Sequence, residues 1–215
     1  MLKNYIILGP PGSGKGTQAR KLADKLDYVY FGTGDLMRRE AELNTALGLE
    51  FKKVWDEGKG KLISEELVQK FVAKKVDELE IDHGVVFDGY PRTIAQAEHL
   101  EKILSKKHIN NVKVINLVVD AKLLVLRMQT RRVCDKCQTV FEDPNKNGIT
   151  KCDRCGGNLV VRVEDQFAVL TKRIDVYNQQ TLPLISFFKN KGTLINVDGN
   201  PSIEKVWENI QKVTT

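Results

Sequence analysis

The sequence has no long apolar run and no cysteine outside one short segment. Its first apolar run, Tyr5 to Leu8, stops at Gly9 and is too short for a secretion signal or a membrane span. Internal repeats and low-complexity tracts are also missing. With 41% apolar and 29% charged residues over 215 positions, disordered and fibrous classes are excluded, and a cytoplasmic globular protein without a membrane partner is expected.

The net charge is +6, but the lysines and arginines are spread among acidic residues. Lys52 and Lys53, for example, stand close to Asp56 and Glu57. This mixing favours an ordinary solvated surface. A basic cleft for a polyanionic small molecule is the main alternative, with a nucleic-acid partner a weaker one.

Short apolar runs alternate with amphipathic stretches along most of the chain. This alternation predicts an α/β fold, with a parallel five-stranded sheet covered by helices on both faces. Residues 133–163 break the pattern and are expected to form an inserted segment with short β runs. The predicted strands are 3–8, 28–31, 85–87, 112–119 and 193–197, and the predicted helices are 15–26, a helix capped by Thr33, 47–56, 65–79, 93–105, 121–131, 167–189 and 203–213.

Residues 9–17, Gly-Pro-Pro-Gly-Ser-Gly-Lys-Gly-Thr, lie between a predicted strand and a predicted helix, as a phosphate-binding loop requires. Glycines let successive backbone N–H groups turn toward phosphate oxygens, and the helix N-terminus adds partial positive charge. In the general form of this loop, Ser or Thr follows the lysine and binds Mg²⁺. Here Gly16 intervenes, so direct ligation by the Thr17 hydroxyl is left open. The expected ATP-binding residues of the loop are Gly12, Ser13, Gly14, Lys15, Gly16 and Thr17.

The loop, together with Thr-Gly-Asp-Leu-Met-Arg at 33–38 and Asp-Gly-Tyr-Pro-Arg-Thr at 88–93, resembles the adenylate kinase family of nucleoside monophosphate kinases. The resemblance covers nearly the whole chain. It implies reversible, Mg²⁺-dependent phosphoryl transfer from ATP to AMP, giving two ADP, by a monomer with no nucleic-acid partner. It also implies a single three-layer P-loop domain over 1–215, with an AMP-binding insertion at 32–64, a metal-binding ATP lid at 131–163, and the remainder as core.

Arginine suits such a reaction because its planar guanidinium donates paired hydrogen bonds to phosphate and stays charged. The resemblance assigns Arg38 and Arg92 to the AMP phosphate and places the Arg127 guanidinium against the ATP adenine. Val140 and Phe141 fall where family lids contact ATP, although they serve equally well as lid core. The residues expected to act on the transferring phosphoryl group are Lys15, Asp88, Arg92, Arg131, Arg162 and Arg173.

Gln96 is a sensible adenine reader because a side-chain amide both donates and accepts hydrogen bonds. This favours AMP over other monophosphates. Asp88 follows a predicted strand and is expected to hold Mg²⁺ through water, with helix capping as the alternative. The stretch 58–61 is longer than the family pattern, so the alignment of Lys61 is uncertain. The AMP-binding residues implied by the resemblance are Thr33, Arg38, Lys61, Leu62, Ile63, Gly89, Tyr90, Pro91, Arg92, Gln96, Arg162 and Arg173.

Cys134-x2-Cys137 and Cys152-x2-Cys155 have the spacing of two zinc knuckles that complete one tetrahedral four-thiolate site. A structural Zn²⁺ is expected, since four protein ligands leave no open position for catalysis. Disulfides and free thiols are the alternatives, and a cytoplasmic setting disfavours disulfides. Such thiolate sites also accept other metals.

Two other functions compete with this hypothesis. A related kinase with GTP as donor is possible within the same class. A zinc-ribbon protein that binds nucleic acid would need basic residues interleaved with aromatics around the cysteines. Instead, Glu142, Asp143, Glu164 and Asp165 place negative charge there.

Overall fold

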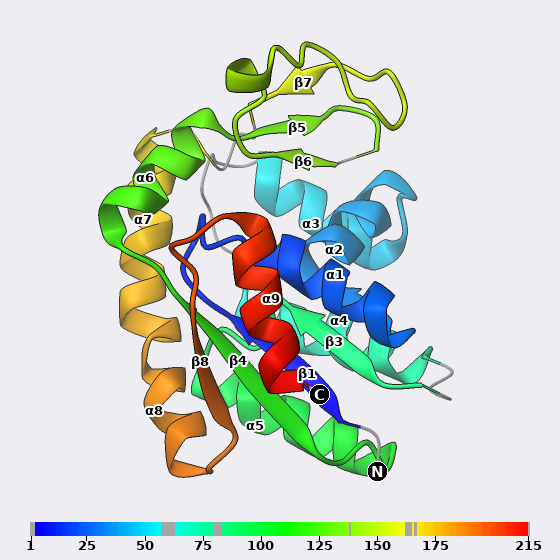
Figure 1. Cartoon of the computed structure of the whole chain (residues 1–215). Coiled ribbons are helices and arrows are strands. Elements are labelled where there is room, and N and C mark those ends of the chain that lie inside the picture. Colours follow the sequence, from blue (N-terminus) through cyan, green and yellow to red (C-terminus); the bar gives the residue numbers. More distant parts are fainter. Residues whose placement is uncertain are drawn as a thin grey trace.

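The computed structural model describes residues 3–56, 63–79, 83–137, 139–161, 165 and 167–214. Five parallel strands form the main sheet in the order β2-β3-β1-β4-β8, which confirms the predicted α/β class (Figure 1). Three short antiparallel strands form a separate small sheet in the order β6-β5-β7. The strands are β1 Asn4–Leu8, β2 Val29–Gly32, β3 Val85–Asp88, β4 Val112–Val118, β5 Arg132–Cys134, β6 Val140–Phe141, β7 Leu159–Val160 and β8 Leu194–Asp198.

Helices cover both faces of the main sheet because side chains alternate between the faces along each strand. Tyr5 and Ile7 of β1 pack in one core with α1 and α9, and Ile6 and Leu8 pack in another with α4, α5 and α8. Figure 1 shows the small sheet beyond this body, reached through α6 and α7. The helices are α1 Lys15–Leu26, α2 Thr33–Glu42, α3 Ala46–Asp56, α4 Glu65–Asp77, α5 Ile94–Lys106, α6 Ala121–Thr130, α7 Phe167–Val176, α8 Pro183–Asn190 and α9 Ile203–Thr214.

Two expectations about helices are wrong in detail. Gly32, and not Thr33, is the N-cap of α2, and Thr33 is the first residue of the helix. The helix expected over 167–189 is divided by a π-helical turn at Tyr177–Thr181, after which α8 begins at Pro183. Proline has no N–H to continue the hydrogen bonds of a preceding helix, but it is well suited to the first turn of a new one.

The carboxyl ends of β1 and β3 meet at one edge of the sheet, because the two strands pair in parallel with Ile7 opposite Asp88. The phosphate loop follows β1, so its backbone and Asp88 are brought together although 70 or more residues separate them. Ligands of open α/β sheets bind at such an edge. Within the described residues, no helix is both long and apolar enough to cross a bilayer.

Candidate active site

The phosphate loop has the backbone conformation that an anion site needs. Gly12 and Gly14 have φ values of 82° and 81°, in the left-handed region that side chains disfavour. Gly14 is the N-cap of α1 and supplies no capping side chain, so the first N–H groups of the helix face the loop. These donors and the helix dipole together favour phosphate at this point.

Lys15 lies where several of the predicted charges meet. Burial lowers the pKa of Lys15 to about 8, the nearby carboxylate of Asp88 opposes this, and the positive charges of Arg173, Arg92 and Arg131 reinforce it. The structure therefore places four of the other five residues expected to act on the phosphoryl group within electrostatic reach of Lys15. A cluster with this excess of positive charge favours a polyanionic ligand.

Asp88 faces the phosphate loop from the end of β3. A Cβ added at Gly16 would lie 3.0 Å from Asp88 Oδ2, a contact close enough to push the carboxylate away from α1. Asp88 Oδ2 accepts a hydrogen bond from Tyr30 at 3.0 Å, while the buried Oδ1 has no partner among the described residues. The glycine that departs from the general loop pattern thus makes room for a carboxylate.

Arg131 and Arg173 converge on Asp165, whose side chain is fully buried. Arg131 Nε donates to Asp165 Oδ2 at 2.8 Å, and Arg173 Nη1 donates to Asp165 Oδ1 at 3.3 Å. From the sequence, Asp165 was named only as one of four acidic residues near the cysteine segment. The sequence did offer one signal, because Arg131 and Arg173 were assigned to the same phosphoryl group. Two arginines held close together need a carboxylate nearby, since unpaired buried charge is costly.

Replacement of Asp165 by asparagine is expected to lower the free energy of unfolding by about 3 kcal/mol, because two arginines lose their buried counter-charge. Urea denaturation monitored by circular dichroism measures this. The matched control is Glu208→Gln, which removes the carboxylate of an exposed Lys205–Glu208 pair with both side chains more than half exposed. Exposed pairs contribute little, so an equal loss in both variants would contradict the structural role of Asp165.

Arg127 lines a narrow pocket between the phosphate loop and the start of α9. Its guanidinium donates to the backbone oxygens of Gly199 at 2.9 Å and of Asn200 and Pro201 at 3.0 Å. Burial raises the pKa of Glu142, which lines the same pocket from the small sheet, and the Arg127 charge opposes that shift. Val140 is exposed and Phe141 is half-buried.

Most of the described residues expected around AMP come from α2, from the loop that joins β3 to α5, and from the first turn of α5. Arg38 pairs with Asp35 one helical turn earlier in α2. Arg92 Nε donates to the oxygen of Gly89 at 2.9 Å, and Arg92 N donates to Gln96 Oε1 at 2.8 Å. Gln96 therefore also holds the backbone of the loop that carries Arg92.

Further residues expected at the AMP site lie in α2, in the loop after β3 and just before α4. Thr33 is buried, and its hydroxyl has no hydrogen-bond partner among the described residues. Tyr90 is buried, its peptide bond to Pro91 is cis, and its hydroxyl lies 2.9 Å from His99 Nδ1. Ile63 packs partly buried against the core. The positions 61, 62 and 162, which hold Lys61, Leu62 and Arg162, lie outside the described residues.

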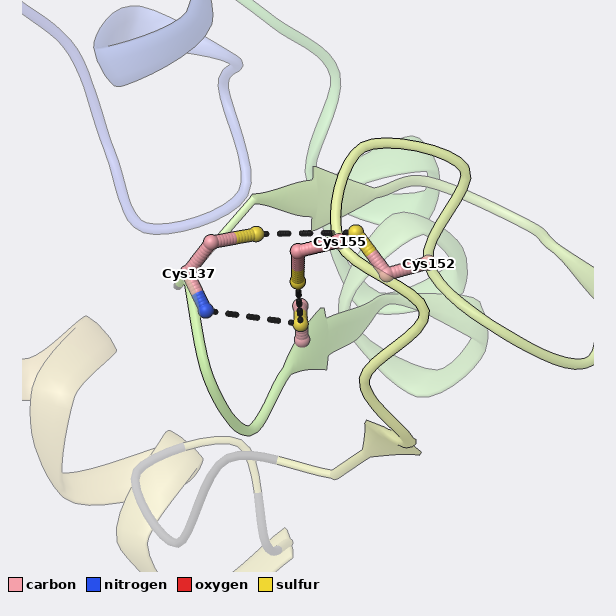
Figure 2. A group of neighbouring side chains, drawn as sticks. Cys137, Cys152 and Cys155 are labelled. Carbon is pink, nitrogen blue, oxygen red and sulfur yellow. Dashed lines mark hydrogen bonds between the residues drawn. The ribbon is translucent and has the colours of Figure 1, made fainter.

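The four cysteines of the inserted segment lie together as the spacing predicted. Their sulfur atoms all lie within 4.8 Å of one another, and Figure 2 shows Cys137, Cys152 and Cys155 turned toward a common centre. Cys134 and Cys155 approach to 3.4 Å between sulfurs, and Cys137 and Cys152 to 3.5 Å. No disulfide joins them.

This arrangement fits a tetrahedral metal ion. A zinc–sulfur distance of about 2.3 Å places tetrahedral sulfurs about 3.8 Å apart, within the range seen here. The backbone N–H groups of Lys136 and Cys137 both donate to Cys134 Sγ at 3.4 Å. A Cβ at Gly157 would lie 2.5 Å from the same sulfur, so this glycine keeps the space for it. The four cysteines can hold a structural metal.

The comparisons agree with these features. A family model described as adenylate kinase matches residues 7–193. The chain belongs to the adenylate kinase family. Relatives named adenylate kinase include one from Thermoanaerobacter sp. strain X514, 41% identical over 211 residues that cover 96% of this chain and 95% of the relative. Others come from Clostridium tetani strain Massachusetts / E88, 39% identical over 214 residues, and Archaeoglobus fulgidus, 39% identical over 213, each covering 98% of this chain and 97% of the relative.

As a member of the adenylate kinase family, the chain is an enzyme that transfers phosphoryl groups between adenine nucleotides. The matched range 7–193 spans all four cysteines. Residues whose importance the sequence did not reveal are Tyr30, Asp35 and Asp165.

Proposed function

We propose that this adenylate kinase moves the terminal phosphoryl group of Mg²⁺-bound ATP onto AMP and forms two ADP. The observation that carries the proposal is the convergence of Lys15, Asp88, Arg92, Arg131 and Arg173 between two groups of predicted nucleotide contacts. Two polyanions repel each other strongly, and this positive charge offsets their repulsion. Holding them in line also converts an encounter of two substrates into a reaction within one complex.

In the proposed reaction, an oxygen of the AMP phosphate attacks the γ-phosphorus of ATP. The bond between this phosphorus and the β,γ-bridging oxygen breaks, and the electron pair remains on the β-phosphate of the departing ADP. The attacking oxygen is already ionised, so no general base is needed. Lys15, Arg131, Arg162 and Arg173 stabilise charge on the transferring group, and Asp88 holds water bound to Mg²⁺.

The AMP-binding side is proposed to comprise the insertion 32–64 and the loop that follows β3. Arg38 and Arg92 bind the AMP phosphate. Thr33 offers a buried hydroxyl, and Gln96, with its oxygen used by Arg92 N, offers its amide NH₂ to the adenine edge. The remaining proposed contacts are Lys61, Leu62, Ile63, Gly89, Tyr90 and Pro91.

The donor side is proposed to use the phosphate loop from Gly12 to Thr17, with Arg127 against the adenine and Val140 and Phe141 above the nucleotide. Residues 131–163 act as a lid held together by one structural Zn²⁺ on the four cysteines. Such a small segment has little core of its own, and a metal supplies the missing folding free energy. Closure of the lid excludes water, which would otherwise hydrolyse ATP. The enzyme is proposed to act as a cytoplasmic monomer.

An assay of purified enzyme with paired donors and acceptors tests this function. ATP, AMP and Mg²⁺ are expected to yield two ADP for each AMP consumed, measured by anion-exchange chromatography. GTP as donor, and UMP or CMP as acceptor, should react much more slowly. ADP formation no faster than in an enzyme-free blank would refute the proposal. Faster transfer from GTP than from ATP would show that GTP is the donor.

A further inference from the structure

The hydroxyl of Tyr30 lies between two carboxylates that belong to opposite sides of the site. It lies 3.0 Å from Asp88 Oδ2, at the end of β3, and 3.4 Å from Asp35 Oδ2, in α2. Ionised carboxylates only accept hydrogen bonds, and a phenol has a single proton to donate. Tyr30 can therefore satisfy one of the two carboxylates well at any moment, and in this structure the shorter contact is to Asp88.

The backbone and the neighbouring side chains hold the Tyr30 ring in this position. A Cβ added at Gly32 would lie 2.5 Å from the Tyr30 ring and hydroxyl, so the ring occupies the space that a side chain at 32 would fill. Arg20 lies over the ring, with its Cζ 4.1 Å from the ring centroid, and also pairs with Asp35. The direction of the hydroxyl is set by this packing.

The hydroxyl keeps its proton throughout the working pH range. Burial raises the pKa of Tyr30 far above its ordinary value, the charges of Asp88 and Asp35 raise it further, and Arg20 opposes them only in part. A tyrosinate between two carboxylates would add a third negative charge at one point. Tyr30 is thus a permanent donor whose only freedom is the choice of acceptor.

We propose that Tyr30 is a positioning residue that couples the two nucleotide sites by passing its single hydrogen bond between Asp88 and Asp35. The inference rests on the proposed function, which places the Mg²⁺-bound donor nucleotide beside Asp88 and the AMP phosphate on Arg38. Asp35 pairs with Arg38, so whatever holds Asp35 also orients the Arg38 guanidinium.

The coupling follows from the electrostatics of the two acceptors. A Mg²⁺-bound nucleotide next to Asp88 offsets its negative charge and weakens it as an acceptor from Tyr30. The hydroxyl then donates to Asp35, which is held more firmly and fixes Arg38 for the phosphate of AMP. Because coupling between two binding sites is reciprocal, AMP also strengthens binding of the donor nucleotide.

Tyr30→Phe tests the inference, since it removes the hydroxyl and keeps the ring beside Gly32 and Arg20. AMP affinity is measured by calorimetry with and without Mg²⁺ and a non-hydrolysable ATP analogue. The wild-type enzyme is expected to bind AMP about fivefold or more tightly when the analogue is present. In Tyr30→Phe this ratio should fall to about one, and KM for AMP should rise more than KM for ATP.

Tyr28→Phe is the matched control, because Tyr28 precedes the same strand but packs on Gly84 and Tyr5 at its other end. It should keep the wild-type ratio. Gly32→Ala, whose Cβ displaces the Tyr30 ring, should lose the coupling even though Tyr30 remains. It also decides the matter if Tyr30→Phe fails to fold.

The failure of this inference is distinguishable from failure of the proposed function. A wild-type enzyme that phosphorylates AMP but shows no coupling, or a folded Tyr30→Phe enzyme that keeps the coupling, overturns the role of Tyr30 alone. If Tyr30→Phe does not fold, a Gly32→Ala enzyme with the wild-type ratio overturns it equally. A wild-type enzyme that forms no ADP from ATP and AMP overturns the function itself.

Discussion

Replacement of Lys15 by alanine is expected to lower kcat/KM for ATP by about 10³-fold, while the protein keeps its fold and stability. The loss follows because a pre-placed charge aimed at the transferring phosphoryl group is typically worth that much when water is excluded. Stability is kept because the folded state buries the Lys15 ammonium at a cost, as its lowered pKa indicates. Initial rates and a thermal melt at pH 7 measure both effects.

The sign of the stability effect follows from proton binding. The folded pKa of about 8 lies below the ordinary lysine value of 10.5, so between these two pH values the unfolded chain binds more protons. The contribution of Lys15 to stability therefore rises with pH over this window and is unfavourable below it. A Lys15→Ala protein that melts well below wild type at pH 7 would show that its lost activity reflects lost structure.

Lys15→Arg and Lys25→Ala complete this experiment. Lys25 is exposed in the last turn of α1. Its replacement should leave kcat/KM within about twofold of wild type, because most surface substitutions have small effects. In the wild type, kcat/KM for ATP should fall as pH rises through 8, because Lys15 loses its charge in the free enzyme. Arginine stays charged, so Lys15→Arg should lack that fall whatever its absolute activity.

Replacement of Cys152 by serine is expected to abolish stoichiometric metal binding and to lower the melting temperature by about 10 °C. Three thiolates with one hydroxyl bind zinc poorly, so the small sheet would lose the folding free energy that the proposed metal supplies. A loss of about 3 kcal/mol corresponds to about 10 °C for a domain of this length. Atomic absorption gives the metal content per chain, and calorimetry gives the melting temperature.

Asp153→Asn is the control for the metal, because Asp153 is exposed between two cysteines and is not a ligand. It should bind one metal per chain and melt with the wild type. A Cys152→Ser protein that contains no metal and melts at the wild-type temperature would overturn the structural role of the site. Catalysis should fall as well, since Arg131 adjoins β5, which begins the small sheet.

Local patterns in the sequence were sufficient where neighbouring residues decide the structure. The helix expected over 15–26 is α1 to the residue, because a strand, a glycine loop and an amphipathic stretch follow one another directly. The cysteine cluster was equally predictable, since two Cys-x2-Cys turns are short-range features. The helix over 167–189 was not, because amphipathic spacing does not reveal a π turn ahead of Pro183.

The candidate site also divides into residues that short motifs predicted and contacts that only the structure reveals. Lys15, Asp88 and the arginines were predicted because each belongs to a short motif with a chemical purpose. Asp165 was missed because its burial between Arg131 and Arg173 depends on how the end of α6 and α7 come together. Gln96 was predicted to bind the adenine base. Its hydrogen bond from Arg92 N could not be predicted, because it depends on the conformation of the loop between β3 and α5.

The sequence by itself determined the fold class, the glycine loop between β1 and α1, the cysteine cluster and the family, because each of these depends on residue types at fixed local spacings. Only the tertiary structure decided which charges face one another. Asp88 and Asp35 come close to a single hydroxyl because β2 and β3 pair in parallel and α2 follows β2 at once. No spacing along the chain indicates such a contact, since strand pairing brings together residues that are far apart in sequence.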